Sequence, residues 1–204
     1  MEFAPKHLHN AIERTHTEDA VRDLLKWVGE NPDREGLKET PKRVLAALKF
    51  WCSGYDKDPK SVLKTFTDGS QNYDEVVFQG SLPFFSLCEH HLVAFFGYAH
   101  IAYLPTNQVV GLSKLARLTE IYARRLQTQE RMTAQIADAL GECLECSAAV
   151  VTQARHLCME SRGVQKVGTV TVCSALRNKF KSSPELRAEF MSLVQTAMGG
   201  IKIL

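Results

Sequence analysis

The sequence predicts an α+β fold, in which N-terminal helices precede an antiparallel ββααββ core. Apolar residues recur with helical spacing near both ends and in the middle of the chain, and segments rich in β-branched and aromatic residues lie between them. A chain of 204 residues is long enough for a domain with a real core. We expect residues 1–60 to form an N-terminal helical region and residues 61–204 to form the main domain.

Two helices are expected before the core. Thr17 has the side chain of an N-cap, and an apolar stripe follows it until the turn-forming segment 29–33. Thr40-Pro41 predicts the start of the second helix, because proline is tolerated at the first helical position, and Gly54 predicts its end. The stretch 55–73 is polar and is expected to be irregular.

The core is predicted from alternating strand and helix signals. Strands are expected at 75–78, 95–104, 148–158 and 168–175, helices at 113–125 and 128–145, and a last helix from Ser183-Pro184 to about Met198.

Composition excludes several classes of protein. The net charge of +2 gives no electrostatic reason to expect a nucleic-acid or membrane partner, and no apolar run approaches 18 residues. Residues 1–10 have no signal-peptide character. Six cysteines are too sparse for a disulfide scaffold, so we expect a reducing compartment, the cytoplasm by default.

The most informative motif is Cys88-Glu89-His90-His91, followed much later by His156-Leu157-Cys158. Thiolate and imidazole are preferred zinc ligands, and a catalytic zinc has three protein ligands and a water. Such a set would leave a histidine beside each cluster for proton transfer. On a strand, His156 and Cys158 would face the same way. Spacing leaves open whether His90 or His91 joins Cys88, and a structural zinc or ordinary buried cysteines and histidines are the alternatives.

Other cysteines and histidines are expected to have structural roles. Cys143 and Cys146 share a helix face and have no second pair to complete a site. Cys52 and Cys173 are interpreted as core residues, His100 as a structural hydrogen-bonding residue in a strand, and His7, His9 and His16 as residues without a role.

A candidate anion site lies where Gly111 leads into a helix at Ser113-Lys114, with Arg117 one turn later. An ordinary N-cap with solvated basic residues is the alternative. Arg162 supplies another guanidinium just after Cys158. Gln129-Glu130 begins the next helix, where a carboxylate either complements the helix dipole or accepts hydrogen bonds from a guanine.

These motifs together resemble the GTP cyclohydrolase I family, over about residues 18–192. The matching segments are Cys88 to Leu92, Gly97 with His100 to Pro105, Gly111 to Leu115, Gln129 to Arg131, His156 to Met159, Arg162-Gly163, and the region from Asn31-Pro32 to Arg43. The resemblance implies zinc ligands Cys88, His91 and Cys158, catalytic residues His90, His156 and Ser113, and substrate-binding residues Gln129, Glu130, Ser113, Lys114, Arg117, Arg162 and Arg43.

The resemblance also implies the tunnelling fold for the catalytic domain and a homodecamer with active sites between subunits. The implied cofactor is Zn²⁺ and the implied substrate is GTP. Zinc-activated water would open the guanine ring at C8, formate would leave, and rearrangement and closure would give 7,8-dihydroneopterin triphosphate. The chain departs from the family pattern at Ala94, Ser161, Cys173 and Asn178, none of which is an expected ligand or catalytic residue.

Three rival interpretations are less well supported. A zinc nucleobase deaminase would need an H-x-E motif together with a P-C-x-x-C motif, and the P-C-x-x-C motif is missing. A non-catalytic oligomer with structural zinc would bind metal without releasing formate. A reductase of 7-deazaguanine nitriles would share the fold but would lack this Cys/His cluster.

Overall fold

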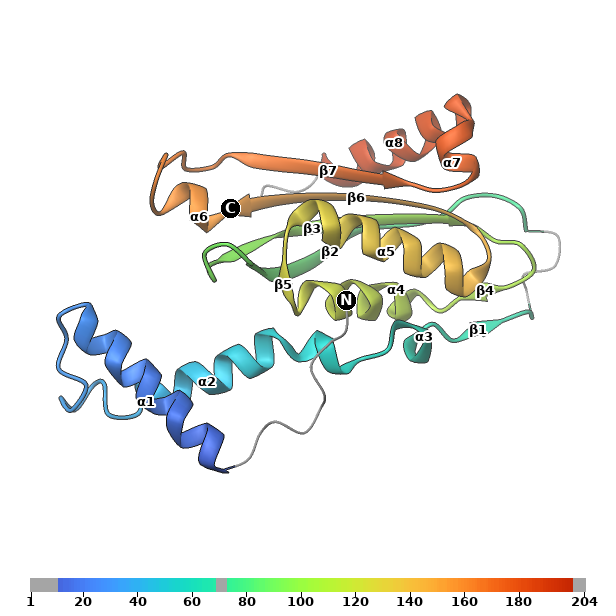
Figure 1. Cartoon of the computed structure of the whole chain (residues 1–204). Coiled ribbons are helices and arrows are strands. Elements are labelled where there is room, and N and C mark those ends of the chain that lie inside the picture. The colour runs from blue at the N-terminus through green and yellow to red at the C-terminus, as the bar shows by residue number, and fades with distance from the viewer. Residues whose placement is uncertain (1–10, 69–72, 200–204) are drawn as a thin grey trace.

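A curled five-stranded sheet forms the centre of the molecule, with helices on both faces (Figure 1). The computed structural model describes residues 11–68 and 73–199. The α+β class predicted from the sequence is confirmed.

The sheet has the order β5-β2-β3-β6-β7. Its strands are β2 (Val77–Cys88), β3 (Ala94–Leu104), β5 (Leu126–Gln127), β6 (Ser147–His156) and β7 (Val170–Leu176). Neighbouring strands are antiparallel, except that β5 runs parallel to β2 and places Gln127 beside Cys88. Two short strands, β1 (Thr65–Phe66) and β4 (Val109–Val110), form a separate antiparallel pair.

Helices α4 (Leu112–Ala123) and α5 (Gln129–Leu144) cover one face of the sheet. Their apolar stripes pack on alternate strand residues such as Phe84, Phe95 and Val150, all of which are almost fully buried. On the other face, α8 (Pro184–Met198) packs Phe190 and Val194 over part of the sheet, next to α7 (Lys179–Ser182).

The N-terminal helices α1 (Ala11–Trp27) and α2 (Thr40–Trp51) extend away from this body (Figure 1). The predicted cap at Thr17 is wrong, because α1 already begins at Ala11. The predicted start of α2 at Thr40-Pro41 is confirmed, with Glu39 at the N-cap. The segment expected to be irregular contains three short elements: η1 (Ser53–Asp56), α3 (Pro59–Val62) and β1.

Two core boundaries differ from the prediction. The first core strand, expected at 75–78, runs from Val77 to Cys88, because a β-bulge between Gln79 and Leu82 takes up Gly80 and Ser81 and pairing with β3 then continues. The strand predicted over 148–158 ends at His156, and a helical turn, α6 (Leu157–Glu160), follows it. Cys158 therefore lies on a helical turn, so its strand-like relation to His156 is wrong.

The expected boundary at residue 60 between the N-terminal helical region and the main domain stays a prediction, and so does the tunnelling fold. Among residues 11–68 and 73–199, no helix has the length and apolar character needed to cross a bilayer.

Candidate metal and proton-transfer site

The end of β2 holds Cys88 in a tight turn that leads into β3. The Cys88 carbonyl accepts the backbone N–H groups of His91 (3.3 Å) and Leu92 (2.8 Å), and the Cys88 N–H donates to Val93 (2.9 Å). Leu92 has φ 54°, the left-handed conformation that reverses the chain. The turn therefore brings the side chain of His91 back towards the Cys88 thiol.

Cys88, His91 and Cys158 place their ligand atoms within 4.8 Å of one another. The Cys88 Sγ lies 3.7 Å from His91 Nδ1. His90 Nδ1 is also near this sulfur, at 3.9 Å, but His90 is not part of the three-residue group. Two thiols and one imidazole suit zinc better than magnesium or calcium, which prefer oxygen ligands.

Burial and the neighbouring Cys88 thiol raise the pKa of Cys158. A thiol with a raised pKa becomes a thiolate most readily when a cation neutralises it, so metal binding at Cys158 would release a proton. Arg162, from the loop after α6, lies 3.0 Å from His91 Nε2.

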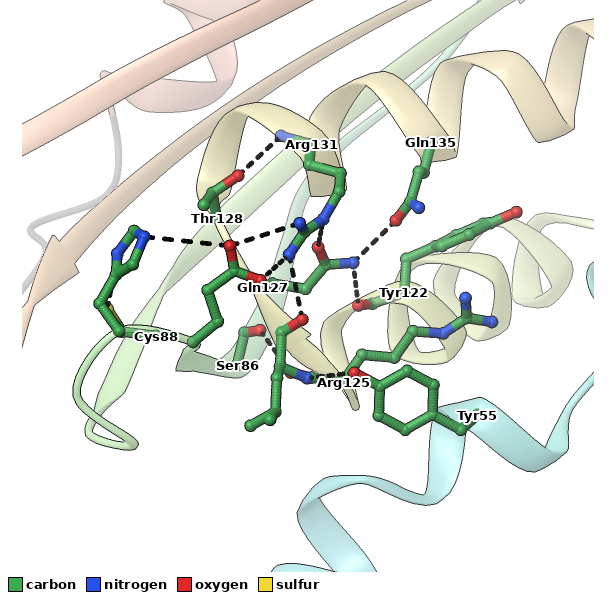
Figure 2. A network of polar contacts seen from close by, with 12 residues as sticks. Tyr55, Ser86, Cys88, Tyr122, Arg125, Gln127, Thr128, Arg131 and Gln135 are labelled. Carbon is green, nitrogen blue, oxygen red and sulfur yellow. Dashed lines mark hydrogen bonds and ion pairs between the residues drawn. The ribbon is translucent and has the colours of Figure 1, made fainter. Parts of the chain in front are cut away.

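A polar network next to Cys88 secures the turn that follows it (Figure 2). The Glu89 carboxylate forms an ion pair with Arg131, and the Glu89 N–H donates to the Gln127 carbonyl at 3.0 Å. Arg131 also donates to the Gln127 side chain (2.9 Å), whose amide nitrogen donates to Gln135 (2.8 Å) and to the Tyr122 carbonyl (3.0 Å). The turn that carries Cys88 and His91 is therefore connected by hydrogen bonds to the first turns of α5.

His156, at the end of β6, lies against Phe95 and Gln129. Its ring stacks on Phe95, with centroids 4.7 Å apart and an angle of 2° between the planes. Its Nε2 lies 2.8 Å from Gln129 Oε1. Burial lowers the pKa of His156, and the nearby Glu130 carboxylate opposes part of that effect.

Gln129 is 1% exposed, and both ends of its amide have partners. Its nitrogen lies 3.1 Å from the Thr152 carbonyl, 3.1 Å from the Thr152 hydroxyl and 3.0 Å from the Thr171 carbonyl. Thr133 completes the network through its hydroxyl, which donates to the Gln129 carbonyl at 2.7 Å and contacts Thr152 Oγ1 at 2.7 Å.

The neighbouring residue, Glu130, is exposed and acts electrostatically on both His156 and Cys173. The interpretation of Cys173 as a core residue is wrong, because this side chain is only half-buried. Burial, followed by the Glu130 charge, raises the pKa of Cys173, so its thiol stays protonated. Cys52, the other expected core cysteine, is also only half-buried.

Apart from Arg162, the expected phosphate-binding residues lie elsewhere in the chain. Ser113 and Lys114 are in the first turn of α4, and Arg117 follows one turn later. The opposite end of α4 leads to β5, which pairs with Cys88. A helix of this length separates its two ends by about 18 Å. Arg43 is exposed on α2, outside the sheet domain.

The remaining cysteines and His100 behave mostly as expected. His100 is fully buried, and its Nδ1 accepts from the Ser81 N–H at 3.3 Å. Cys143 lies on α5, but Cys146 comes after the helix end, so the shared helix face is wrong. Burial raises the pKa of Cys146 to about 12, which makes it inert. His7 and His9 lie outside the described residues.

Sequence reasoning missed four residues that support the site: Phe95, Arg131, Thr133 and Thr152. Thr152 had a usable signal, because it shares a strand face with His156 at even spacing. Arg131 and Thr133 also bond to residues four positions earlier, but their contacts with Glu89 and Thr152 join distant parts of the sequence and had no such signal.

Comparison with known proteins gives the family of the chain. The family model described as GTP cyclohydrolase I matches residues 17–195. A GTP cyclohydrolase 1 from Campylobacter curvus is 51% identical over 180 residues, which cover 88% of this chain and 94% of that protein. One from Corynebacterium glutamicum is 53% identical over 180 residues, with 86% and 90% covered. One from Janthinobacterium sp. is 51% identical over 180 residues, with 88% and 90% covered. With a family match over most of its length and relatives at about half identity, the chain belongs to the GTP cyclohydrolase I family.

Proposed function

We propose that this protein hydrolyses the guanine ring of GTP at C8, releases formate, and closes the product to 7,8-dihydroneopterin triphosphate, a step of pterin synthesis. The observation that carries the proposal is the group of Cys88, His91 and Cys158 beside a held His156, in a chain of this family. The Arg162 guanidinium lies beside His91, and the exposed Glu130 carboxylate acts on His156; these groups suit a phosphate and a purine base.

Zinc is the proposed cofactor because two sulfurs and one imidazole nitrogen match its preferred donors. Three protein ligands leave a coordination position for a non-protein ligand. When bound, zinc supplies a Lewis acid that makes water a nucleophile near neutral pH.

The histidines outside the metal group supply the proposed proton transfers. His156 is neutral near pH 7, because burial lowers its pKa, and it is held rigidly against Phe95. We assign it the proton that moves to and from N7 as the imidazole ring opens. His90 is exposed, with its Nε2 3.9 Å from Glu89, and we assign it the proton transfer at the ribose, with Ser113 assisting.

Glu130 is proposed to accept hydrogen bonds from the guanine N1–H and amino group. It is exposed and lies close enough to His156 to influence its pKa. Gln129 stands beside it as the other member of the expected base-binding pair. Lys114, Arg117, Arg162 and Arg43 are proposed to hold the triphosphate.

The distribution of these residues supports active sites between subunits. Arg162 lies beside the metal group, whereas Lys114 and Arg117 lie near the far end of α4. A second copy of the chain could bring its α4 N-terminus to the metal group of the first. The outer strand β7 leaves Val170 and Val172 exposed, as an unpaired edge would in a subunit that joins a ring. We propose a decamer, as the resemblance implies, located in the cytoplasm.

The direct test is to incubate the purified protein with GTP and to measure formate and an oxidised, fluorescent pterin. Both products are expected in equal amounts from the zinc-loaded protein. Formate without pterin would place the protein at ring opening alone, and the absence of both would refute the proposal.

A further inference from the structure

We propose that Gln129 is a positioning residue, which holds His156 as the tautomer protonated at Nε2 and leaves Nδ1 as the ring nitrogen through which protons move. This inference rests on the proposed function for the role of His156. It gives the Gln129 side chain a task other than base recognition.

The orientation of the Gln129 amide follows from its neighbours. Backbone carbonyls only accept hydrogen bonds, and two of them, from Thr152 and Thr171, lie 3.1 and 3.0 Å from one end of the amide. That end must therefore be the NH₂ group. The other end is the carbonyl oxygen, which can only accept, and it faces His156 Nε2 at 2.8 Å. His156 Nε2 must carry the hydrogen of this contact.

The hydroxyl groups around the amide give the same orientation. Thr133 Oγ1 donates to the Gln129 backbone carbonyl at 2.7 Å, so its single hydrogen is used there. In the 2.7 Å contact between the two threonines, Thr152 is then the donor. Thr152 Oγ1 keeps its lone pair free to accept from the Gln129 NH₂ at 3.1 Å. The two hydrogens of the Gln129 NH₂ face three acceptors, the carbonyls of Thr152 and Thr171 and the Thr152 hydroxyl, and a flipped amide would turn its oxygen towards both carbonyls.

Phe95 restricts the ring further. Its stacking on His156 fixes the plane of the imidazole, and antiparallel pairing of the two residues on β3 and β6 fixes the backbone below it. Within residues 11–68 and 73–199, no protein group forms a hydrogen bond with His156 Nδ1. A neutral His156 therefore presents a lone pair at Nδ1 and has no N–H to give until Nδ1 has taken a proton.

This arrangement separates two functions within one dipeptide. The Gln129 side chain is buried and its donors are used by protein carbonyls, so it has no free donor for a base. The exposed Glu130 is then the side chain of the pair that distinguishes guanine. Loss of Gln129 should therefore lower kcat, and loss of Glu130 should raise KM.

A double-mutant cycle tests the coupling. The variants are Gln129→Met, His156→Ala and the double variant, with Glu142→Met, at an exposed position of the same helix, as the control. Losing the partner that orients an imidazole typically costs on the order of 10- to 100-fold, so we expect kcat of Gln129→Met to fall by that factor while KM for GTP stays within about twofold. In the His156→Ala background the same substitution should change kcat little, because it acts through the missing ring. The zinc content of each variant is measured alongside.

Three kinetic outcomes would overturn the proposal. These are a raised KM with unchanged kcat, a reduced preference for GTP over ITP in Gln129→Met, or a full additional loss in the double variant. An equal loss in Glu142→Met would indicate a general disturbance of α5 and would also contradict the proposal.

Neutron diffraction from deuterium-exchanged crystals of the wild-type protein at pH 8 gives a readout that needs neither turnover nor a variant. We expect deuterium at His156 Nε2 and none at Nδ1. Deuterium at Nδ1 would refute the tautomer. If the protein released no formate from GTP but showed this pattern, the proposed function would fail and the positioning by Gln129 would stand.

Discussion

Gly97 on β3 is the position at which the structure predicts the largest effect of one added methyl group. A Cβ at this residue would lie 1.9 Å from the Gln153 carbonyl oxygen and 2.8 Å from the Ala154 Cα, both on the backbone of β6. Real Cβ atoms essentially never come closer than 3.0 Å to another heavy atom, so β3 and β6 would have to separate by about 1.1 Å. Neither contact is with a flexible side chain that could turn away.

Overpacking costs about 1–3 kcal/mol, and each weakened hydrogen bond of the ladder adds about 1 kcal/mol. We expect Gly97→Ala to lower the free energy of unfolding by about 3–5 kcal/mol, which for a chain of this size lowers Tm by roughly 6–20 °C. Activity should fall as well, because Ala154 lies two residues before His156 on the displaced strand.

The assay is thermal unfolding at matched protein concentration, with Gly141→Ala as the control. A Cβ at Gly141 would meet only the Cys146 carbonyl at 3.6 Å, an ordinary contact, and this residue lies inside α5. Alanine is favoured over glycine in a helix by about 0.5–1 kcal/mol, so Gly141→Ala should raise Tm by about 1–4 °C. A Gly97→Ala protein as stable as the wild type would refute the reasoning about strand separation.

Four further predictions follow from the site and the fold. Cys158→Ser should lose bound zinc and formate release together, measured by metal analysis and turnover; full activity in a metal-free preparation would contradict the proposed cofactor. Glu130→Ala should reduce the preference for GTP over ITP by at least about tenfold while tripolyphosphate still binds, because a site built for hydrogen bonds rejects a base that lacks them; an unchanged preference would exclude this role. Burial lowers the pKa of His100 below the unfolded value of 6.5, so the unfolded chain binds more protons at low pH. The free energy of unfolding should therefore fall as the pH drops below about 6.5, by at most about 1.4 kcal/mol per pH unit. His100→Phe should flatten this pH dependence in denaturant titrations, and equal pH dependence in the variant and the wild type would disprove the role of His100. Sedimentation should give a mass of about 230 kDa, ten times the chain mass of 22.9 kDa, and a fully active monomer would rule out sites between subunits.

Local features of the fold could be predicted because their causes are local. Thr128 and Ser183 accept backbone N–H groups three residues later, from Arg131 and Leu186, as N-cap residues do. Asn178 shows the same principle at a departure from the family pattern: it has φ 53°, a conformation that glycine adopts without strain, and its side chain donates to the Cys146 carbonyl.

By itself, the sequence determined the class of the fold, the donor types of the metal group and the family, because periodicity and motif spacing are properties of the chain alone. Spacing alone left open whether His90 or His91 joins Cys88, and the family resemblance implied His91. The tertiary structure supplies the physical reason, since a left-handed residue at Leu92 and a helical turn at Cys158 set those directions. It also joined Gln129 to His156, because strand pairing and helix packing bring the carbonyls of Thr152 and Thr171 to one amide. Contacts between residues 23 to 42 positions apart have no local signal, and they decide which atom of a functional side chain is free to react.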